Sequence, residues 1–386
     1  MHDVAVVGAG PAGLTAARIL ASRGRDVVVL EEHREVGVPV HCTGVLGMDA
    51  FSEFPLPSQA ILGTAQVATF IAADGTSVSV DAERANAAVV DRAAFDQALA
   101  DGSLAAGAEV RRGARVRTID TGDARVAVEL DGGERVESRS LILACGANYR
   151  FNRQLGLGVP RSFVQSAQLE LPLDGPSSVE VHLGREVAPA GFAWAVPFHR
   201  GGEPHTRIGL MCESRALAYF RRFAARLRGR FHAASAAWPD PRLKILPLGP
   251  VSRTYAPRLL AVGDAAGLVK PTTGGGIYYS LVSAQIAADT LDEALGADDF
   301  REARMRRYEA QWRERLGPEI RIGLAFRTLV ARMNDRAIDA VVELARIDGL
   351  VPMLRQTADF NWHRQSALAL LKHAQFRRIL LSSLWS

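Results

Sequence analysis

The stretch Val4–Leu20, VAVVGAGPAGLTAARIL, decides the fold of this 386-residue chain. Its apolar start predicts a short buried strand, and the following segment predicts a helix over 12–23. Between them Gly8, Gly10 and Gly13 have G-x-G-x-x-G spacing: the first permits a tight turn, the second a close approach of a pyrophosphate, the third close packing of helix on strand. A second strand over 26–32 completes a β-α-β unit, and Glu31 near its end is placed to bind a ribose diol.

A second glycine-rich stretch, GDAAGLVKPTTGGGI at 263–277, follows the apolar strand 259–262. Asp264 comes at the carboxyl end of that strand, where its carboxylate can accept a hydrogen bond from a sugar alcohol. Three consecutive glycines ending at Gly276 leave room for a flat ring beside a helix N-terminus. A nicotinamide dinucleotide does not need this second site, whereas the ribityl and isoalloxazine groups of FAD do. The two loops together predict an FAD cofactor, although the second could also be a generic turn.

Composition narrows the class of protein. Hydrophobic residues make up 48% of the chain and charged residues 23%, as in a globular protein. The three cysteines are far apart, without the spacing of a zinc site, which predicts neither a structural metal nor a disulfide framework. The start has no signal-peptide pattern, and no stretch is apolar enough to span a membrane. We therefore expect a cytoplasmic protein.

The pattern along the chain predicts a discontinuous α/β architecture. An Asp-Gly turn at Asp74 and Gly75 predicts a hairpin over 66–80, and strand-rich segments cover 110–143 and 166–212. Helices are expected over 91–102, over 213–231, and over most of the chain after Gly276. We expect an antiparallel-sheet substrate domain inserted into a Rossmann-type FAD-binding domain, followed by a helical C-terminal region. The expected bounds are 1–60, 84–160 and 250–295 for the FAD-binding domain, 61–83 and 161–249 for the substrate domain, and 296–386 for the C-terminal region.

These motifs resemble a known family. The GAGPAG loop, the arginine of DRAAFDQAL and GDAAG…P…GGGI are similar to flavoproteins of the para-hydroxybenzoate hydroxylase superfamily. PVHCTG at 39–44 resembles the P-x-x-C-x-G segment of its geranylgeranyl reductases, and FAWAVP at 192–197 resembles their Y-x-W-x-F-P segment. The resemblance covers about residues 1–295. It implies FAD contacts at the following positions: Ala12, Glu31, Cys42, Thr43, Val45, Arg92, Val116, Asp264, Gly276 and Ile277.

The same resemblance implies a reaction. Members of this family use reduced FAD to saturate isoprenoid double bonds, which needs a hydride, a proton and a dry apolar cleft. Phe192 and Trp194 are candidates to line the cleft, and Trp194 could equally be a core aromatic. A thiol in water has a pKa of about 8.5 and is mostly protonated at neutral pH. Cys42 could therefore supply the proton, or it could merely pack against the flavin as a small apolar side chain.

Two departures from the superfamily pattern leave alternatives open. The hydroxylases carry Asp-Gly where this chain has Cys145 and Gly146, and Phe192 replaces a tyrosine. A monooxygenase or a halogenase-like enzyme acting on an aromatic or apolar molecule is the main alternative. Halogenases use a lysine of the N-terminal domain, and this chain has none before Lys244. A non-enzymatic FAD-binding partner is the third possibility, and it predicts no turnover.

Partners are less well defined by the sequence. We expect an isoprenoid or other apolar substrate, with NAD(P)H or a reduced ferredoxin as electron donor, and no nucleic acid, because no aromatic-basic motif is present. Arg161, Arg185 and Arg207 are candidates for binding an anionic head group. Residues 214–230 contain six arginines and no acid, and residues 351–386 carry a smaller basic excess. Each stretch could be a solvated helix face or a peripheral contact with the anionic inner face of a membrane.

Overall fold

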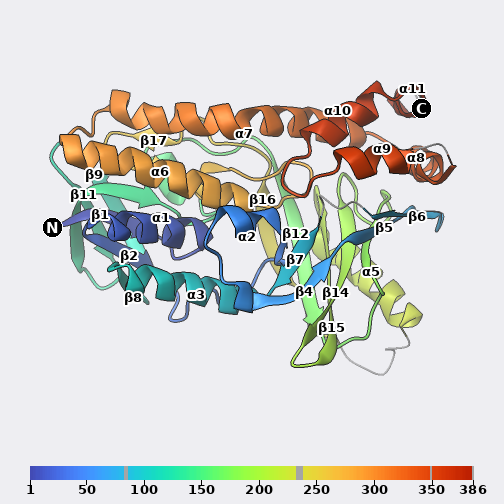
Figure 1. Cartoon of the computed structure of the whole chain (residues 1–386), viewed down its shortest axis with the longest axis horizontal. Coiled ribbons are helices and arrows are strands. Elements are labelled where there is room, and N and C mark those ends of the chain that lie inside the picture. The colour runs from blue at the N-terminus through green and yellow to red at the C-terminus, as the bar shows by residue number, and fades with distance from the viewer. Residues whose placement is uncertain (82–85, 232–237, 348–349, 385–386) are drawn as a thin grey trace.

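The computed structural model describes residues 1–81, 86–231, 238–347 and 350–384, and the strands of this part of the chain form three sheets (Figure 1). The largest has the order β17-β18-β11-β1-β2-β8, and its central pairs are parallel. β10 and β9 extend it as an antiparallel hairpin on β11. Its strands are β1 (His2–Val7), β2 (Val27–Glu31), β8 (Glu109–Arg112), β9 (Val116–Thr121), β10 (Val126–Leu130), β11 (Arg135–Leu143), β17 (Tyr255–Ala256) and β18 (Leu259–Ala261).

Helices cover this sheet and explain its apolar sequence. β1 and β2 are buried because α1 (Pro11–Ser22) packs against them, and α1 in turn contacts α3 (Arg92–Ala105) and α6 (Ile277–Ala297). Strands buried on both faces are continuous apolar runs rather than alternating ones. The structure thus confirms the Rossmann-type unit, with β18 and α6 arriving from a point more than 100 residues after β11.

The second sheet has seven strands in the order β16-β12-β15-β14-β13-β5-β6. All its pairs are antiparallel except β13 with β5. α5 (Ala216–Arg230) covers one face, and the hairpin predicted over 66–80 is confirmed as β5 and β6. The strands are β5 (Val67–Ile71), β6 (Ser77–Asp81), β12 (Phe163–Leu171), β13 (Val179–His182), β14 (Phe192–Arg200), β15 (Glu203–Cys212) and β16 (Arg242–Pro247).

A three-stranded sheet connects the two larger ones. Its order is β3-β7-β4, with β3 at Val45–Gly47, β4 at Ile61–Ala65 and β7 at Ala87–Val90. β4 lies in the segment expected for the substrate domain, yet it pairs with β7 rather than with the seven-stranded sheet. The expected boundary at residues 83 and 84 lies outside the described residues. The short helix α2 (Asp49–Glu53) contacts β3, whereas α4 (Arg150–Gln154) lies beside β9 of the largest sheet.

The C-terminal region is helical, as expected, and it spans the molecule. α7 (Glu302–Val330) packs on α6 and β17 at one end and on α10 at the other, so that it runs along both large sheets (Figure 1). α8 contacts β6, and the segment between α9 and α10 turns back toward the centre. The last helices are α8 (Asp335–Ile347), α9 (Leu350–Thr357), α10 (Arg364–Lys372) and α11 (Ala374–Leu384). No helix in the described ranges is long and apolar enough to cross a membrane.

Candidate functional site

A cavity of about 510 Å³ lies where the two large sheets meet. This volume is within the range of small-molecule sites. Its wall combines the glycine-rich loops of the Rossmann unit, residues 37–45, the inner face of the seven-stranded sheet and two residues of the C-terminal region. Nearly all the residues expected to bind FAD or substrate line it: Gly8, Gly10, Ala12, Glu31, Cys42, Thr43, Val45, Arg92, Val116, Phe192, Trp194, Asp264, Gly276 and Ile277.

The dinucleotide loop has the geometry that its glycines predict. Gly8 has φ +105°, and a Cβ there would lie 2.5 Å from the Ala144 carbonyl oxygen. Gly10 is extended, faces the cavity, and would meet no atom within 4 Å if it carried a Cβ. Gly13 is the exception among the expected cofactor-binding residues, because it is buried away from the cavity lining. A Cβ on Gly13 would lie 2.1 Å from the Gly8 carbonyl oxygen, so its role is helix-strand packing.

Glu31 holds this loop in place. One carboxylate oxygen accepts a hydrogen bond from the Ala9 amide at 2.7 Å, and the other accepts from the His33 amide at 3.0 Å. The His33 ring nitrogen lies 2.6 Å from that second oxygen as well. A carboxylate has about four acceptor positions, so about one is left for a ribose hydroxyl. Glu31 is nearly buried at the edge of the cavity, where that ribose is expected.

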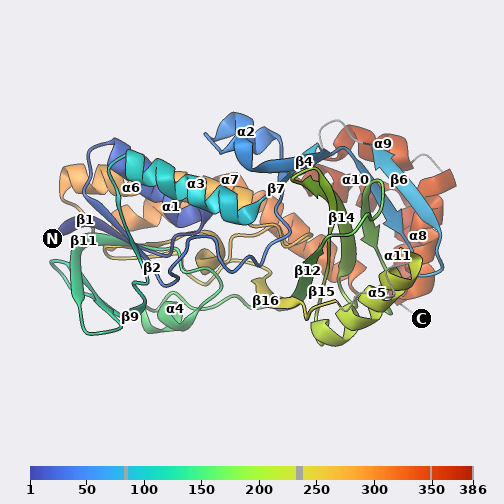
Figure 2. The same ribbon diagram turned by 90° about the horizontal axis from the view of Figure 1, so that it is seen from below.

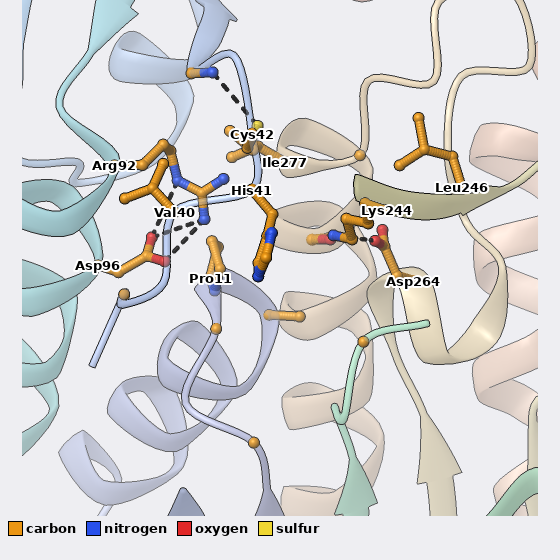
Figure 3. A pocket seen from close by; sticks show the side chains of 18 of the residues that line it. Pro11, Val40, His41, Cys42, Arg92, Asp96, Lys244, Leu246, Asp264 and Ile277 are labelled. Carbon is orange, nitrogen blue, oxygen red and sulfur yellow. Dashed lines mark hydrogen bonds and ion pairs between the residues drawn. The ribbon is translucent and has the colours of Figure 1, made fainter. Parts of the chain in front are cut away.

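Residues 37–45, which we call the strap, cross the cavity opposite α1 (Figure 3). Gly44 has φ +68°, and a Cβ there would lie 2.6 Å from the Val90 carbonyl oxygen, so the turn requires glycine. The Thr43 hydroxyl donates to the Gln168 side-chain oxygen on β12 at 2.6 Å. The Gly44 amide donates to the Cys42 sulfur at 3.4 Å. The strap is therefore fixed to the substrate sheet, and it holds the thiol at the cavity wall.

Arg207 on β15 fixes the strap from behind. Its guanidinium donates to the Thr43 carbonyl at 2.7 Å, to the Val90 carbonyl at 2.8 Å and to Glu170 at 2.8 Å. The side chain is 1% exposed. Its donors are thus committed to the strap, to β7 and to β12, and they do not face a head group. Nothing in the sequence indicated this role, because the partners come from three distant segments.

Arg92 and Asp96 form a buried ion pair next to the strap. The shortest nitrogen–oxygen distance is 2.8 Å, and Asp91 caps the helix that carries both residues. Burial alone would lower the pKa of Arg92, but the charge of Asp96, with a smaller contribution from Cys42, holds that pKa above its ordinary value. Figure 3 shows the strap residues His41 and Cys42 between this pair and the Lys244–Asp264 pair on the other side. Arg92 is thus a permanent cation at the cavity wall.

The second glycine-rich loop lies on the far side of the strap. Asp264 is in a 3-10 turn over Gly263–Ala266, and one of its oxygens lies 3.4 Å from the Lys244 ammonium. A Cβ on Gly276 would lie 2.7 Å from the other Asp264 oxygen, so a larger residue there would displace this carboxylate. Neither α1 nor α6 has a side-chain N-cap, and the first backbone amides of each helix lack intrahelical acceptors. Two uncapped helix ends thus face one cavity.

The substrate-sheet end of the cavity is apolar. Phe192 and Trp194 on β14 pack at 5.7 Å between ring centroids, beside Val179, Val181, Val196 and Leu246. A Cβ on Gly209 of β15 would lie 2.4 Å from the Trp194 ring, so this glycine makes room for the indole. The Trp194 indole nitrogen is buried without a hydrogen-bond partner among the described residues. The wall is suited to an apolar molecule.

Three further features of the cavity wall concern individual groups. Cys145 and Gly146 line the cavity where the hydroxylases carry Asp-Gly, and burial raises the pKa of the Cys145 thiol to about 12, so it stays neutral. The Val116 carbonyl accepts a hydrogen bond from Arg150, which fixes that edge. Lys270, Phe360 and His363 also line the cavity. No motif marks the C-terminal segment that carries Phe360 and His363, and Lys270 has no predicted role although it lies in the second glycine-rich stretch.

The arrangement fits FAD. Gly10 leaves open space at the uncapped end of α1, where a pyrophosphate would bind the free amides, and Glu31 would hold the ribose. Asp264, Gly276 and the uncapped end of α6 would hold the ribityl chain and the ring, with the strap across them. The two cradles open into one cavity that ends in an apolar wall.

Comparison with known proteins agrees with this arrangement. Residues 2–166 match the family described as pyridine nucleotide-disulphide oxidoreductase. A digeranylgeranylglycerophospholipid reductase of Methanocaldococcus jannaschii is 30% identical, with 89% of this chain and 90% of the relative covered. Digeranylgeranylglycerophospholipid reductase 1 of Methanopyrus kandleri is 32% identical, with 92% and 96% covered.

Solved structures show the same fold. A geranylgeranyl bacteriochlorophyll reductase-like protein of Thermoplasma acidophilum superposes with a TM-score of 0.84 at 24% identity, with 99% of each chain covered. A halogenase in complex with phloroglucinol and FAD superposes with a TM-score of 0.68 at 17% identity, with 100% of this chain and 91% of the other covered. The extent of the sequence match to the reductases, added to the paired FAD cradles, places this chain in the geranylgeranyl reductase family of FAD-dependent oxidoreductases.

Proposed function

We propose that this protein saturates carbon-carbon double bonds of an isoprenoid chain of the geranylgeranyl type, carried on a lipid, a quinone or a diphosphate. One observation carries the proposal: the FAD cradles and the apolar wall of Phe192, Trp194 and Val196 belong to the same cavity. An apolar chain that enters along this wall meets the strap and the second glycine-rich loop, between which the flavin ring would lie. The names of the relatives, which specify digeranylgeranylglycerophospholipids, support the same class of substrate.

FAD, once reduced, supplies the hydride for such a reaction. The chain's own residues do the remaining work. The apolar wall excludes water, so that the hydride is not lost to side reactions. Arg207 and Gln168 fix the strap, and the strap fixes Cys42, which can hold a proton at its sulfur or simply pack on the ring. The Arg92 cation and the uncapped start of α6 favour negative charge in the cavity, which a reduced flavin carries.

Oxygen chemistry is the main alternative, since halogenases share the fold. That likeness is at 17% identity and concerns the fold alone. The N-terminal part of this chain has no lysine, which disfavours halogenation. A reductase and an oxygenase differ in what reoxidises the flavin, and this difference provides the test.

We expect the purified, FAD-loaded protein, reduced anaerobically, to be reoxidised by a geranylgeranyl lipid or a menaquinone. Mass spectrometry should find the product heavier by the mass of the added hydrogen. Stopped-flow absorbance of the flavin measures the rate, and parallel reductions with NADPH, NADH and reduced ferredoxin identify the electron donor. Rapid reoxidation by oxygen together with an oxygenated aromatic product, and no saturated lipid, would overturn the proposal.

The same proposal includes peripheral contact with an anionic membrane at the inner face. β16 is an edge strand whose Lys244 and Leu246 line the cavity, whereas Leu243 and Ile245 point outward and are 53% and 55% exposed. Ile245 lies opposite Gln165 on β12, and the Gln165 side chain accepts a hydrogen bond from the first amide of α5. β16 therefore lies near that helix (Figure 2). The exposed arginines of α5 and its start would meet anionic head groups: Arg215, Arg221, Arg222, Arg226 and Arg230.

A variant with Leu243→Asp and Ile245→Asp is expected to bind anionic vesicles roughly 30-fold more weakly. It loses the insertion of two apolar side chains, which contributes about 1 kcal/mol each when partly buried. Sedimentation with phosphatidylglycerol vesicles at low salt measures this. Leu104→Asp with Ile347→Asp, at two other exposed positions, is the matched control and should bind as the wild type does. Wild-type binding that does not weaken with salt would contradict the role of the arginines.

A further inference from the structure

The C-terminal segment over 358–363 closes one side of the cavity. Phe360 and His363 line it together with Lys270, the first residue of the tight loop that ends in the three glycines. His363 shares a hydrogen bond with the Thr272 hydroxyl, and the Lys270 ammonium donates to the Phe360 carbonyl at 2.6 Å. The C-terminal region therefore completes the site that the Rossmann unit begins.

The Lys270 ammonium is buried with few groups around it that would stabilise its positive charge. Its side chain is 5% exposed, its nitrogen lies 4.2 Å from the centre of the Phe360 ring, and a Cβ on Gly275 would lie 2.8 Å from its last carbon. No carboxylate lies within 4.0 Å of the ammonium among the described residues. One hydrogen bond to a carbonyl leaves two of its three N–H groups without an acceptor among the described residues.

The carboxylates near Lys270 offset only part of the effect that desolvation has on its pKa. Desolvation lowers the pKa of Lys270 to about 7, against the opposing effect of Asp49 and Asp359. Asp49 accepts from Asn361 and from the Ala50 amide, while Asp359 accepts from two backbone amides of its own segment. His363, the other titratable group packed here, has its pKa lowered to about 3 by burial and by Lys270 and stays neutral. Lys270 can therefore both hold and release a proton at neutral pH.

Other groups on the described cavity wall are less suited to donate a proton. Arg92 keeps its proton, and Lys244 is paired with Asp264. His41 has its pKa lowered, by burial first and then by Lys244, so its imidazole is largely neutral. Cys145 and His363 are also excluded: the pKa of the Cys145 thiol is about 12, so it does not release its proton at neutral pH, and burial keeps His363 out of its acidic imidazolium form. His33 and Asp96 also line the cavity, but they are paired with Glu31 and Arg92. Of the groups considered, Cys42 and Lys270 remain.

We propose that Lys270 is the proton donor of the reduction, a role that rests on the proposed function of this site. In the step, an N–H bond of the ammonium breaks and a C–H bond forms at the alkene carbon that does not receive the hydride. The hydride from the reduced flavin forms the second C–H bond, so the alkene gains two electrons and the flavin loses them. Lys270 is left as a neutral amine that still donates to the Phe360 carbonyl, and it takes up a proton from solvent when the product leaves.

The test compares Lys270→Met, Lys270→Arg and Cys42→Ala, with Lys372→Met on exposed α10 as the matched control. Lysine-to-methionine and lysine-to-arginine changes at 270 should leave FAD binding intact and slow flavin reoxidation by the alkene at least about 100-fold, the usual range for a lost general acid. The wild-type rate should fall about tenfold per pH unit above pH 7, and this dependence should vanish in both variants. Cys42→Ala should keep the fall in rate above pH 7 that both Lys270 variants lose, whatever its own rate, and Lys372→Met should match the wild type in rate and in pH dependence.

The protonation of Lys270 can also be measured directly, without an activity assay, because the chain has so few lysines. The chain has three lysines, so protein carrying lysine labelled with ¹³C at Cε gives three signals, and Lys270→Met identifies one by its loss. That signal should titrate near pH 7 in the FAD-loaded protein. Titration only at alkaline pH, or full activity of Lys270→Arg with the wild-type pH profile, would overturn the role of Lys270 alone. A wild-type enzyme that reduces no alkene would overturn the proposed function as well.

Discussion

A Gly10→Val variant is expected to fold normally and to bind FAD at least about 100-fold more weakly, a loss of roughly 3 kcal/mol. Gly10 has φ −83° and ψ 179°, which valine adopts readily, and a Cβ there meets no protein atom within 4 Å. The added side chain would therefore project into the cavity, where the pyrophosphate approaches the start of α1. The free energy of unfolding without FAD should change by less than about 1 kcal/mol, because only the N-cap preference is altered.

Gly10 is the position in this loop where a substitution should weaken FAD binding without destabilising the fold. A Cβ on Gly8 or on Gly13 would collide with backbone at 2.5 or 2.1 Å, so variants there would unfold the Rossmann unit. Flavin absorbance retained after gel filtration measures binding, and the rise in melting temperature on adding FAD gives a second measure. Gly229→Val on exposed α5, also without neighbours within 4 Å, is the control and should retain FAD. Normal FAD retention in Gly10→Val would contradict the assignment of this cradle.

The Rossmann unit could be predicted from the sequence because its backbone geometry requires particular residue types. Positive φ at Gly8 and Gly44, and the close contact of Gly13 with Gly8, can be met only by glycine. Such requirements appear in the sequence as fixed spacings. The strap and the loop ending at Gly276 could be placed for the same reason.

The rest of the site depends on contacts that have no local signature. Phe360 and His363 reach the cavity because α7 carries the chain along both sheets, which no spacing of residues encodes. Arg207 resembles a surface residue in sequence, yet it is buried and bonded to Glu170, to the Val90 carbonyl of β7 and to the Thr43 carbonyl of the strap. On β16 the usual alternation is inverted: Lys244 faces the cavity while Leu243 and Ile245 face outward. A prediction from hydrophobic alternation would place Leu243 and Ile245 toward the interior and Lys244 toward solvent, which is the reverse of the structure.

The burial of Lys270 should cost stability, and Lys270→Met should reveal that cost through its pH dependence. The pKa is about 7 in the folded protein and 10.5 for an ordinary lysine. Between these values the unfolded chain binds a proton that the native protein lacks, so the free energy of unfolding of the wild type rises with pH across this window. The destabilisation from this group is roughly 4–5 kcal/mol at pH 6 and about 2 kcal/mol at pH 9. Methionine removes it, at the loss of the hydrogen bond to Phe360, which contributes about 1–2 kcal/mol.

Lys270→Met is thus expected to be more stable than the wild type at pH 6, with the difference shrinking by about 2–3 kcal/mol at pH 9. Urea unfolding at both pH values, without FAD, measures this, and Lys372→Met on exposed α10 should show no pH-dependent difference. A difference that is the same at both pH values would mean that Lys270 keeps an ordinary pKa in the folded state. A residue that weakens the fold at neutral pH is retained more easily if its proton is used, so the stability and activity measurements on this one variant bear on the same proposal.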